Sequence, residues 1–456
     1  MRSSTLLSAA LAAGAAAATP SRTTVELPRR AEALPAVSAS GNAFWANGKR
    51  FYMRGIDYQP GGSAANLDPL ANPTICRRDI QRFADLGVNT IRVYAVDNAA
   101  DHTVCMQALN DAGIYLVLDV NNPQYSINRA KPAPSYNEVY LQSVFAVIDE
   151  FSKYSNTLAF FSGNEVINHD EGSTQAAPYV KATTRDMRQY MRNRGHRVIP
   201  VGYSAADVSD NRMQSAQYFN CGTDDERSDF FAFNDYSWCS PSSFTTSGWD
   251  VKVRNFTGYG LPIFLSEWGC ITNGRDFSEL SALMSSQMTG VYSGGLMYEY
   301  SLEENKFGII DLTKNPVSEL PEFGKFKSAL SKYPAPTDNG GFVSTTNSVA
   351  CPTTDSVWDL GSWGPTALPA IPEGAKKYMT EGAGKGPGLD GSGSQNSGED
   401  VHTTASPGSG QPTTTPGSGN GNGQGGAAGH LSPPDFSIFA VTGVVAFCTL
   451  FGTLLL

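Results

Sequence analysis

Two glutamates lie at the ends of predicted β-strands, where carboxylates can do chemistry. Glu165 ends the run FFSGNE, and Glu267 directly follows the run FLS. A carboxylate that follows an apolar strand is costly unless it projects into a solvated or hydrogen-bonded site. Strand ends on opposite sides of a barrel can bring two carboxylates to about 5–5.5 Å, where one attacks a sugar's anomeric carbon and the other acts as acid and base. The pair therefore indicates cleavage of a glycosidic bond with retention of configuration.

The neighbours of the two glutamates support this interpretation and also offer alternatives. Asn164 carries an amide that can hold a sugar 2-hydroxyl in the transition state. Either glutamate alone would as readily be part of a salt bridge at the rim of a barrel. Glu299 is a rival candidate. Because it alternates with Tyr298 and Tyr300, we expect it to point away from the face that those two share.

The elements that must position these residues are short β-rich runs, separated by helical stretches, between about residues 38 and 334. Most of the runs are unbroken and apolar, which is typical of strands buried on both faces. The expected strands are Phe51–Asp57, Thr90–Tyr94, Tyr115–Val120, Leu158–Gly163, Val198–Gly202, Phe230–Asn234, Ile263–Ser266 and Leu296–Tyr300. The expected helices include Thr74–Leu86, Tyr136–Tyr154, Ala176–Arg194 and Ser278–Val291.

This alternation predicts an α/β fold, a (β/α)8 TIM barrel over residues 38–334. A doubly wound open sheet is the alternative, but no glycine-rich phosphate loop follows a strand. Catalysis in a barrel takes place at the carboxyl ends of the strands. Aromatic rings at those ends can stack on sugars, and we expect about half of them to do so. They are Tyr58, Tyr94, Tyr125, Tyr203, Tyr236, Trp268, Tyr298 and Tyr300.

The two ends of the chain differ in composition from the barrel. Residues 1–19 read as a secretory signal peptide, followed by a lead over 20–37. Residues 335–381 have little periodicity and predict a short irregular C-terminal extension that Cys351 ties down. Residues 382–430 are rich in Gly, Ser, Thr and Pro, which predicts a disordered stalk.

Residues 431–456 contain an uncharged apolar run from Phe436 to Leu456. After a spacer that follows small residues, such a run predicts a glycosylphosphatidylinositol (GPI) attachment signal that is removed. A retained membrane-spanning tail is the alternative. Because the chain also opens with a signal peptide, we expect a secreted protein held by a GPI anchor on the outer leaflet of the plasma membrane or in the cell wall.

Cysteine use and charge narrow the function further. An even number of cysteines remains once Cys448 in the tail is removed, which indicates disulfides, although six cysteines allow fifteen pairings. No CxxC spacing occurs and the histidines are scattered, so we expect neither a metal site nor a cofactor. The net charge of −10 argues against nucleic acid as a partner. The sequon at Asn255 predicts N-glycosylation.

Six motifs, in order along about residues 38–330, resemble glycoside hydrolase family 72, the fungal β-1,3-glucanosyltransferases. They are RGIDYQPGG (54–62), NTIRVY (89–94), SGNE (162–165), FNDYSWC (233–239), LSEWGC (265–270) and YEYS (298–301). The resemblance implies that Glu165 is the acid/base and Glu267 the nucleophile. It also implies that β-1,3-glucan serves as both donor and acceptor, with the new reducing end of one chain joined to the non-reducing end of another.

The same resemblance implies further roles. Tyr236 would support the charge of the nucleophile. The implied glucan-binding residues are Tyr94, Asp119, Asn121, Asn122, Gln124, Tyr125, Asn164, Asp207, Arg212, Tyr236 and Tyr298. The implied disulfides are Cys76–Cys105, Cys221–Cys351 and Cys239–Cys270. Many family members carry a cysteine-rich carbohydrate-binding module after the barrel. This chain has only Cys351 between the barrel and the predicted stalk and is similar to the subfamily without the module.

The two carboxylates alone do not distinguish transfer from hydrolysis, because water or a sugar hydroxyl can resolve the same covalent intermediate. The preference for transfer rests on the resemblance. A retaining endo-β-1,3-glucanase is one alternative. A catalytically inactive glucan-binding protein of the cell wall is another, which the presence of both Glu165 and Glu267 disfavours.

Overall fold

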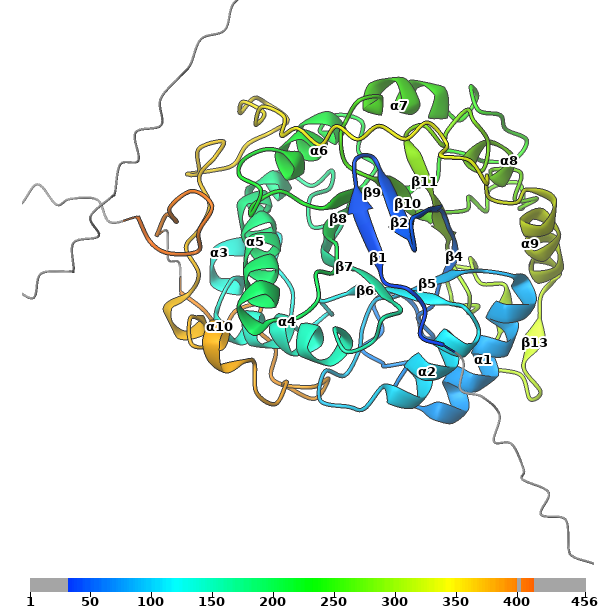
Figure 1. Cartoon of the computed structure of the whole chain (residues 1–456), viewed down its shortest axis with the longest axis horizontal. Helices are drawn as coiled ribbons and strands as arrows, with labels where there is room; N and C mark the ends of the chain where they lie inside the picture. Colours follow the sequence, from blue (N-terminus) through cyan, green and yellow to red (C-terminus); the bar gives the residue numbers. More distant parts are fainter. Residues whose placement is uncertain (1–31, 400–402, 414–456) are drawn as a thin grey trace, which may run out of the picture. The chain divides into compact units, whose positions relative to one another are not determined.

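Eight parallel strands close into a barrel in the computed structural model, which describes residues 32–399 and 403–413 (Figure 1). The barrel strands are β4 (Met53–Asp57), β5 (Thr90–Val93), β6 (Tyr115–Asp119), β7 (Thr157–Asn164), β8 (Val201–Ala206), β9 (Phe230–Asp235), β10 (Ile263–Trp268) and β11 (Tyr292–Met297). They pair in the order β10-β11-β4-β5-β6-β7-β8-β9. The predicted (β/α)8 barrel is therefore confirmed.

Two strands, β8 and β11, differ most from their predicted bounds. β11 begins at Tyr292, before the predicted start at Leu296. The earlier start was missed because the sequence YSGGLM has no long apolar run. Its glycines are needed for close packing: a side chain at Gly294 would overlap the backbone of Met53 in β4. Val198, the predicted first residue of another strand, is 75% exposed, and β8 begins only at Val201.

Helices separate the strands and surround the barrel (Figure 1). α1 (Pro73–Leu86) starts where the Asn72 side chain accepts hydrogen bonds from two backbone N–H groups, and it ends at Gly87 in the left-handed conformation. The other helices between strands are α2 (Thr103–Asp111), α3 (Pro132–Ser135), α4 (Glu138–Phe151), η1 (Ser173–Ala176), α5 (Ala177–Arg194), α6 (Arg212–Asn220), α7 (Trp249–Phe256) and α8 (Leu280–Leu283). After the barrel come β12 (Ile310–Asp311), β13 (Ser318–Glu319), α9 (Pro321–Lys332), η2 (Glu373–Ala375) and α10 (Tyr378–Glu381).

The predicted helix over Ser278–Val291 is wrong, since α8 spans only Leu280–Leu283. The Ser285 hydroxyl donates to the carbonyl of Ala282 at 2.9 Å and accepts from the backbone N–H of Gln287 at 3.3 Å. Such local bonds give the backbone an alternative to the helical pattern. The chain therefore turns soon after α8.

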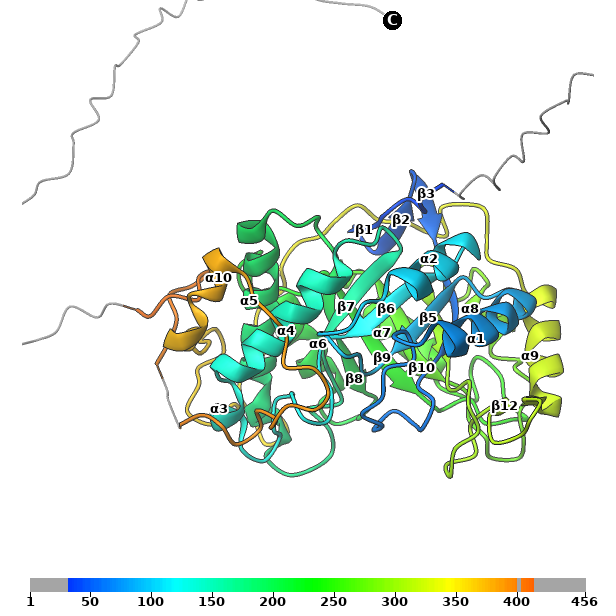
Figure 2. The same cartoon turned by 90° about the horizontal axis from the view of Figure 1, so that it is seen from below.

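A small antiparallel sheet, missed in the sequence, covers one end of the barrel (Figure 2). It consists of β1 (Val37–Ser40), β2 (Ala43–Ala46) and β3 (Lys49–Phe51). Phe44 is fully buried, with its ring 5.8 Å from that of Phe230 and 5.9 Å from that of Phe264. The sheet thus closes the amino-terminal end of the barrel and leaves the carboxyl ends of the strands for the site.

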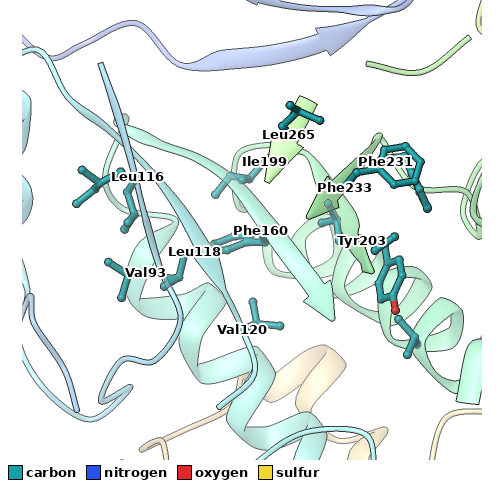
Figure 3. Close-up of a cluster of buried hydrophobic side chains, with 14 of the residues drawn as sticks. Val93, Leu116, Leu118, Val120, Phe160, Ile199, Tyr203, Phe231, Phe233 and Leu265 are labelled. Carbon is teal, nitrogen blue, oxygen red and sulfur yellow. The ribbon is translucent and has the colours of Figure 1, made fainter. Parts of the chain in front are cut away.

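An apolar layer lies between the barrel strands and the surrounding helices (Figure 3). Leu118 and Phe160 are fully buried, and Tyr203 stacks on Phe219 of α6 at 4.4 Å. Burying a side chain of this size stabilises the fold by about 1.5–3 kcal/mol. This layer fixes the strands, and with them the residues at their ends.

Three disulfides are present, in the pairing that the family resemblance implies: Cys76–Cys105, Cys221–Cys351 and Cys239–Cys270. Cys239–Cys270 joins the loops that follow β9 and β10. Cys221–Cys351 ties the C-terminal extension to the end of α6 across 130 residues. A link over so long a segment restricts the unfolded chain strongly, by about 4–5 kcal/mol in the chain-entropy model.

The C-terminal extension does not end where composition suggested. Residues 383–398 continue to hydrogen-bond the barrel, for example through Gly388 to Asn98 and through Ser394 to Gln124. The expected stalk boundary at residue 382 therefore differs from the structure. The reason is that glycine permits close approach between backbones as well as flexibility.

Four parts of the predicted organisation lie outside the described residues: the signal peptide (1–19), the lead up to residue 31, residues 400–402 and 414–430 of the stalk, and the GPI signal (431–456). Among the residues that are described, no helix is long and apolar enough to cross a membrane.

His102 provides a pH-dependent contribution to stability. Its Nε2 lies 2.7 Å from Asp68 Oδ2, and its Nδ1 lies 3.2 Å from Glu150 Oε1. Burial disfavours the charged ring, but the two carboxylates outweigh this and raise the pKa of His102 to about 9. Because the folded-state pKa is raised, this stabilisation is complete below about pH 6.5 and is lost as the pH rises through 9.

We therefore expect the free energy of unfolding to fall by up to about 3 kcal/mol between these pH values. Urea unfolding at a series of pH values measures it. His102→Gln should remove most of the slope, whereas an unchanged slope in this variant would assign the pH dependence to another group.

Candidate active site

The carboxylate of Glu267, at the end of β10, is surrounded by three hydrogen-bond donors. Oε1 accepts from the Tyr94 hydroxyl at 2.8 Å and from Arg92 Nη1 at 3.2 Å. Oε2 accepts from the Tyr236 hydroxyl at 2.6 Å. Burial raises the pKa of Glu267 to about 7, while Arg92 and the two hydroxyls favour the ionised form. The three donors also fix the orientation of the carboxylate.

Arg92, at the end of β5, is a fully buried cation beside Glu267. It makes a two-point contact with Asp119 at the end of β6, with Nε to Oδ2 at 2.8 Å and Nη2 to Oδ1 at 3.2 Å. Its guanidinium lies over the rings of Tyr94 and Phe161, at 4.1 and 4.6 Å. This planar, bidentate arrangement leaves the guanidinium few other positions. Asp119 therefore acts on Glu267 through Arg92.

Glu165, directly after β7, is held in the left-handed backbone conformation with φ of 49°. This conformation costs a non-glycine residue about 1–2 kcal/mol. Two bonds hold it: its N–H donates to Ser204 at 2.9 Å, and its carbonyl accepts from Arg129 at 2.6 Å. Its side chain is half-buried, and Oε1 accepts from Asn234 Nδ2 at 2.8 Å. The backbone conformation thus serves to aim this carboxylate.

Asn234 in β9 connects the two glutamates. It pairs with Glu267 in the register of β9 and β10, and its amide donates to Glu165. Its Oδ1 accepts from the Ser266 hydroxyl at 2.8 Å, so the amide orientation is fixed. The charge of Glu165 is also among the causes that raise the pKa of Glu267. The structure therefore brings the two predicted carboxylates into one site.

Asn164 lies beside this group. Its Oδ1 accepts from the Ser204 hydroxyl at 2.7 Å and from the Asn234 amide at 3.1 Å. With Oδ1 occupied in this way, the amide nitrogen of Asn164 is the group left to donate to a ligand.

Three of the eight predicted aromatic residues gather around Glu267. The rings of Tyr94 and Tyr236 lie edge-on to Tyr298, at 6.5 and 6.2 Å. The hydroxyl of Tyr298 lies 3.3 Å from that of Ser63. The others are buried in packing positions: Tyr58, Tyr125, Tyr203, Trp268 and Tyr300.

The prediction that Tyr298 and Tyr300 share a face is wrong. Tyr300 donates to Asp79 at 2.7 Å, away from the Tyr94 and Tyr236 rings that Tyr298 contacts. The alternation of a strand does not apply, because β11 ends at Met297. Glu299 between them is 1% exposed, and its Oε1 accepts from Asn305 at 2.7 Å. Burial raises the pKa of Glu299 to about 7.

The predicted binding residues after β6 form hydrogen bonds within and next to their own loop. The Asn122 side chain accepts from the backbone N–H groups of Gln124 and Tyr125, each at 2.9 Å. Asn121 Oδ1 accepts from the Tyr140 hydroxyl at 2.6 Å. Among the described residues, the Asn121 amide nitrogen and Gln124 Oε1 have no hydrogen-bond partner. This loop is therefore ordered by side-chain bonds to its backbone.

Asp207 and Arg212 form an ion pair with each other, and Asp207 also binds Lys252 at 2.5 Å. Lys252, on α7, contacts Asp235 at the end of β9, also at 2.5 Å. Lys252 was not predicted as a site residue, since a single lysine in a helical stretch carries no signal of such a role. Arg92 and Asn234 were also missed as site residues, although both lie in the motifs at the strand ends.

A fully buried carboxyl group lies next to the site at the end of β4. Both oxygens of Asp57 lack a hydrogen-bond partner among the described residues. Burial raises the pKa of Asp57 well above its usual range, and the negative charge of Glu267 acts in the same direction. Within residues 32–399 and 403–413, no group of three or more His, Cys, Asp or Glu side chains is arranged to hold a metal ion.

The sequence of this chain matches a known protein family and several of its members. The family model Glyco_hydro_72, described as "Glucanosyltransferase", matches residues 27–334. The chain is 61% identical over 388 residues to 1,3-beta-glucanosyltransferase gel1 of Aspergillus fumigatus, covering 84% of each chain. It is 49% identical over 356 residues to 1,3-beta-glucanosyltransferase GAS5 of Saccharomyces cerevisiae, covering 77% of this chain and 72% of that one.

A solved structure is similar as well. Saccharomyces cerevisiae Gas2p in complex with laminaritriose and laminaritetraose matches with a TM-score of 0.68 and 38% identity. The match covers 75% of this chain and 78% of that chain.

Proposed function

The chain belongs to the glucanosyltransferase family, glycoside hydrolase family 72, and from this premise we propose that Glu165 and Glu267 cut β-1,3-glucan and join it to another glucan chain. The observation that carries the proposal is the pair of carboxylates at the ends of β7 and β10, connected through Asn234. The Glu267 carboxylate is buried among hydrogen-bond donors, and the Glu165 side chain is half-buried. These are the environments that a nucleophile and an acid/base require.

In the first step, Glu267 attacks the anomeric carbon while Glu165 gives its proton to the departing glycosidic oxygen. The bond to the leaving chain breaks, and the donor remains attached to Glu267 as an ester. In the second step, Glu165, now ionised, removes the proton from a hydroxyl at the non-reducing end of an acceptor. The acceptor oxygen displaces Glu267, and the glucan is elongated with retained configuration.

The surrounding residues fit supporting roles. Tyr94, Tyr236 and Arg92 stabilise Glu267 as it leaves the sugar, because each holds one of its oxygens. We propose that Asn164 donates to the 2-hydroxyl and that Tyr298 offers its ring to a sugar. The glucan contacts proposed for Asp119 and the loop after it, for Asp207 and for Arg212 rest on the family resemblance. In this structure Asp119 binds Arg92, and Asn122 binds the backbone of its own loop. Asp207 and Arg212 bind each other.

Transfer rather than hydrolysis is supported by the relatives, which are named 1,3-beta-glucanosyltransferases. The test is to incubate the protein with one laminari-oligosaccharide of defined length and to size the products. Products longer than the substrate are expected. Only shorter products would make the protein a hydrolase, and an unchanged substrate would make it a binding protein.

Tyr236→Phe should lower kcat/KM for glucan by about 10- to 100-fold, because it removes a charged hydrogen bond to Glu267. The Tyr236 hydroxyl favours the ionised carboxylate, so its loss should also raise the pKa of Glu267 and move the acidic limb of the pH profile upward. Initial rates of product formation across pH measure both effects. Tyr300→Phe is the matched control, since its hydroxyl bonds Asp79 instead. Equal losses in the two variants would contradict the role of Tyr236.

We also propose that the protein is secreted and held at the cell surface by a GPI anchor. The composition of residues 1–19 and 431–456 supports this proposal. Asn255 is exposed at the end of α7, as N-glycosylation requires. A phosphatidylinositol-specific phospholipase should release the protein from membranes, whereas a membrane-spanning peptide would resist the enzyme.

A further inference from the structure

Residues 383–398, here called the strap, cross the loops that follow three neighbouring barrel strands (orange segment, Figure 2). In the loop after β4, Asn66 Nδ2 donates to the carbonyl of Leu389 at 2.9 Å. In the loop after β5, Asn98 Oδ1 accepts from the N–H of Gly388 at 2.9 Å. The strap therefore lies at the carboxyl ends of the strands, the end that carries Glu267.

The most numerous strap contacts are with the loop after β6, residues 120–127. The N–H of Ser394 donates to the carbonyl of Gln124 at 2.9 Å. Gln395 Nε2 donates to the carbonyl of Pro123 and to the Ser126 hydroxyl, both at 2.8 Å. The hydroxyl of Tyr125 points to the strap and accepts from the N–H of Gly393 at 3.4 Å.

The strap is fitted closely to the barrel, although its composition is typical of a flexible linker. A side chain at Gly391 would overlap the Tyr125 hydroxyl, and one at Gly386 would overlap the Asn98 side chain. A side chain at Gly398 would overlap the carbonyl of Pro134. These glycines serve close approach between backbone and side chains.

The loop at residues 120–127 is connected to Glu267 through hydrogen bonds. It starts after Asp119, which binds Arg92, and Arg92 binds Glu267. It also carries Asn121 and Gln124, which have amide atoms without a hydrogen-bond partner among the described residues. Within the loop, the Asn122 side chain accepts from the backbone N–H groups of Gln124 and Tyr125. The backbone carbonyls of Pro123 and Gln124 accept from the strap.

We propose that the strap is a positioning segment for the loop at residues 120–127 and thereby sets how tightly the enzyme holds glucan. Gln395 and Gly391 are its positioning residues, and neither contacts Glu165 or Glu267. The proposal rests on the proposed function, because the ligand whose affinity is set is β-1,3-glucan. A chain cut at residue 382 would lose every one of these contacts and should therefore hold glucan more weakly.

The test uses full-length variants. Gln395→Ala removes two hydrogen bonds without adding bulk, and Gly391→Val pushes the strap away from Tyr125. Ser392→Val is the matched control, since Ser392 is exposed and lies between Gly391 and Gly393 in the same segment. The readouts are KM and kcat for laminari-oligosaccharides, and hydrogen exchange at the backbone amides of residues 120–127.

Gln395→Ala and Gly391→Val should raise KM about 3- to 10-fold, leave kcat within about twofold and speed exchange in the loop, and Ser392→Val should change none of these. An unchanged KM alongside faster exchange would overturn the proposal, as would unchanged exchange in both variants. A fall in kcat alone would also overturn it. Failure of the proposed function is read separately, from the products of the unmodified chain, and hydrogen exchange still decides whether the strap orders the loop.

Discussion

Glu267→Gln should lower the turnover of unactivated β-1,3-glucan by roughly 10⁴-fold or more. The amide has nearly the shape of the carboxylate but cannot form the ester with the donor chain. Its NH2 group would also face the hydroxyl or guanidinium groups that now donate to the carboxylate. The loss should appear in kcat, measured from the rate of product formation at saturating oligosaccharide.

Glu299→Gln is the matched control for this substitution. Glu299 is also a buried carboxyl close to the site, and Asn305 already donates to one of its oxygens. We expect this variant to keep activity within about tenfold of the unmodified chain. Should Glu299→Gln lose as much activity as Glu267→Gln while both remain folded by thermal unfolding, the nucleophile would be assigned wrongly.

Glu165→Gln should lower turnover of unactivated glucan by about 10²–10⁴-fold, with the size of the loss set by the leaving group. A departing sugar oxygen needs a proton, whereas fluoride leaves without one. With a β-laminaribiosyl fluoride donor the first step should therefore remain fast, and the second step should become limiting because no base activates the acceptor.

A burst of fluoride, about one per enzyme molecule, followed by slow turnover is the expected signature. Added azide needs no general base and should restore turnover with a β-glycosyl azide as product. If the variant lost the fluoride burst together with glucan turnover, Glu165 would not be the acid/base.

The barrel was predictable because most of its strands are continuous apolar runs that polar residues end. β7 and β10 are examples, since FFSGNE and FLSEW pass directly from buried residues to functional ones. β11 was misplaced because its glycines replace the apolar signal where the backbones of β4 and β10 approach. The amino-terminal sheet was missed because its short strands bury few residues besides Phe44.

Within the site, Glu165 and Glu267 could be identified because each is an acidic residue at the end of an apolar strand. The residues that orient the two glutamates have no such pattern in the sequence. Arg92 is a strand residue whose role depends on Asp119 in the next strand, and Lys252 reaches Asp235 from a helix. The strap was read as a stalk because composition does not distinguish glycine selected for flexibility from glycine selected for close contact.

The central claim, that Glu267 forms a covalent bond with the donor chain, can be tested by trapping. A 2-deoxy-2-fluoro-β-laminaribiosyl fluoride has a good leaving group, and its 2-fluorine slows the second step, so the intermediate should accumulate. Mass spectrometry of the protein should show the addition of one fluorinated disaccharide, on the peptide that contains Glu267. An adduct on a different residue, or turnover to an α-configured product without any adduct, would contradict the mechanism.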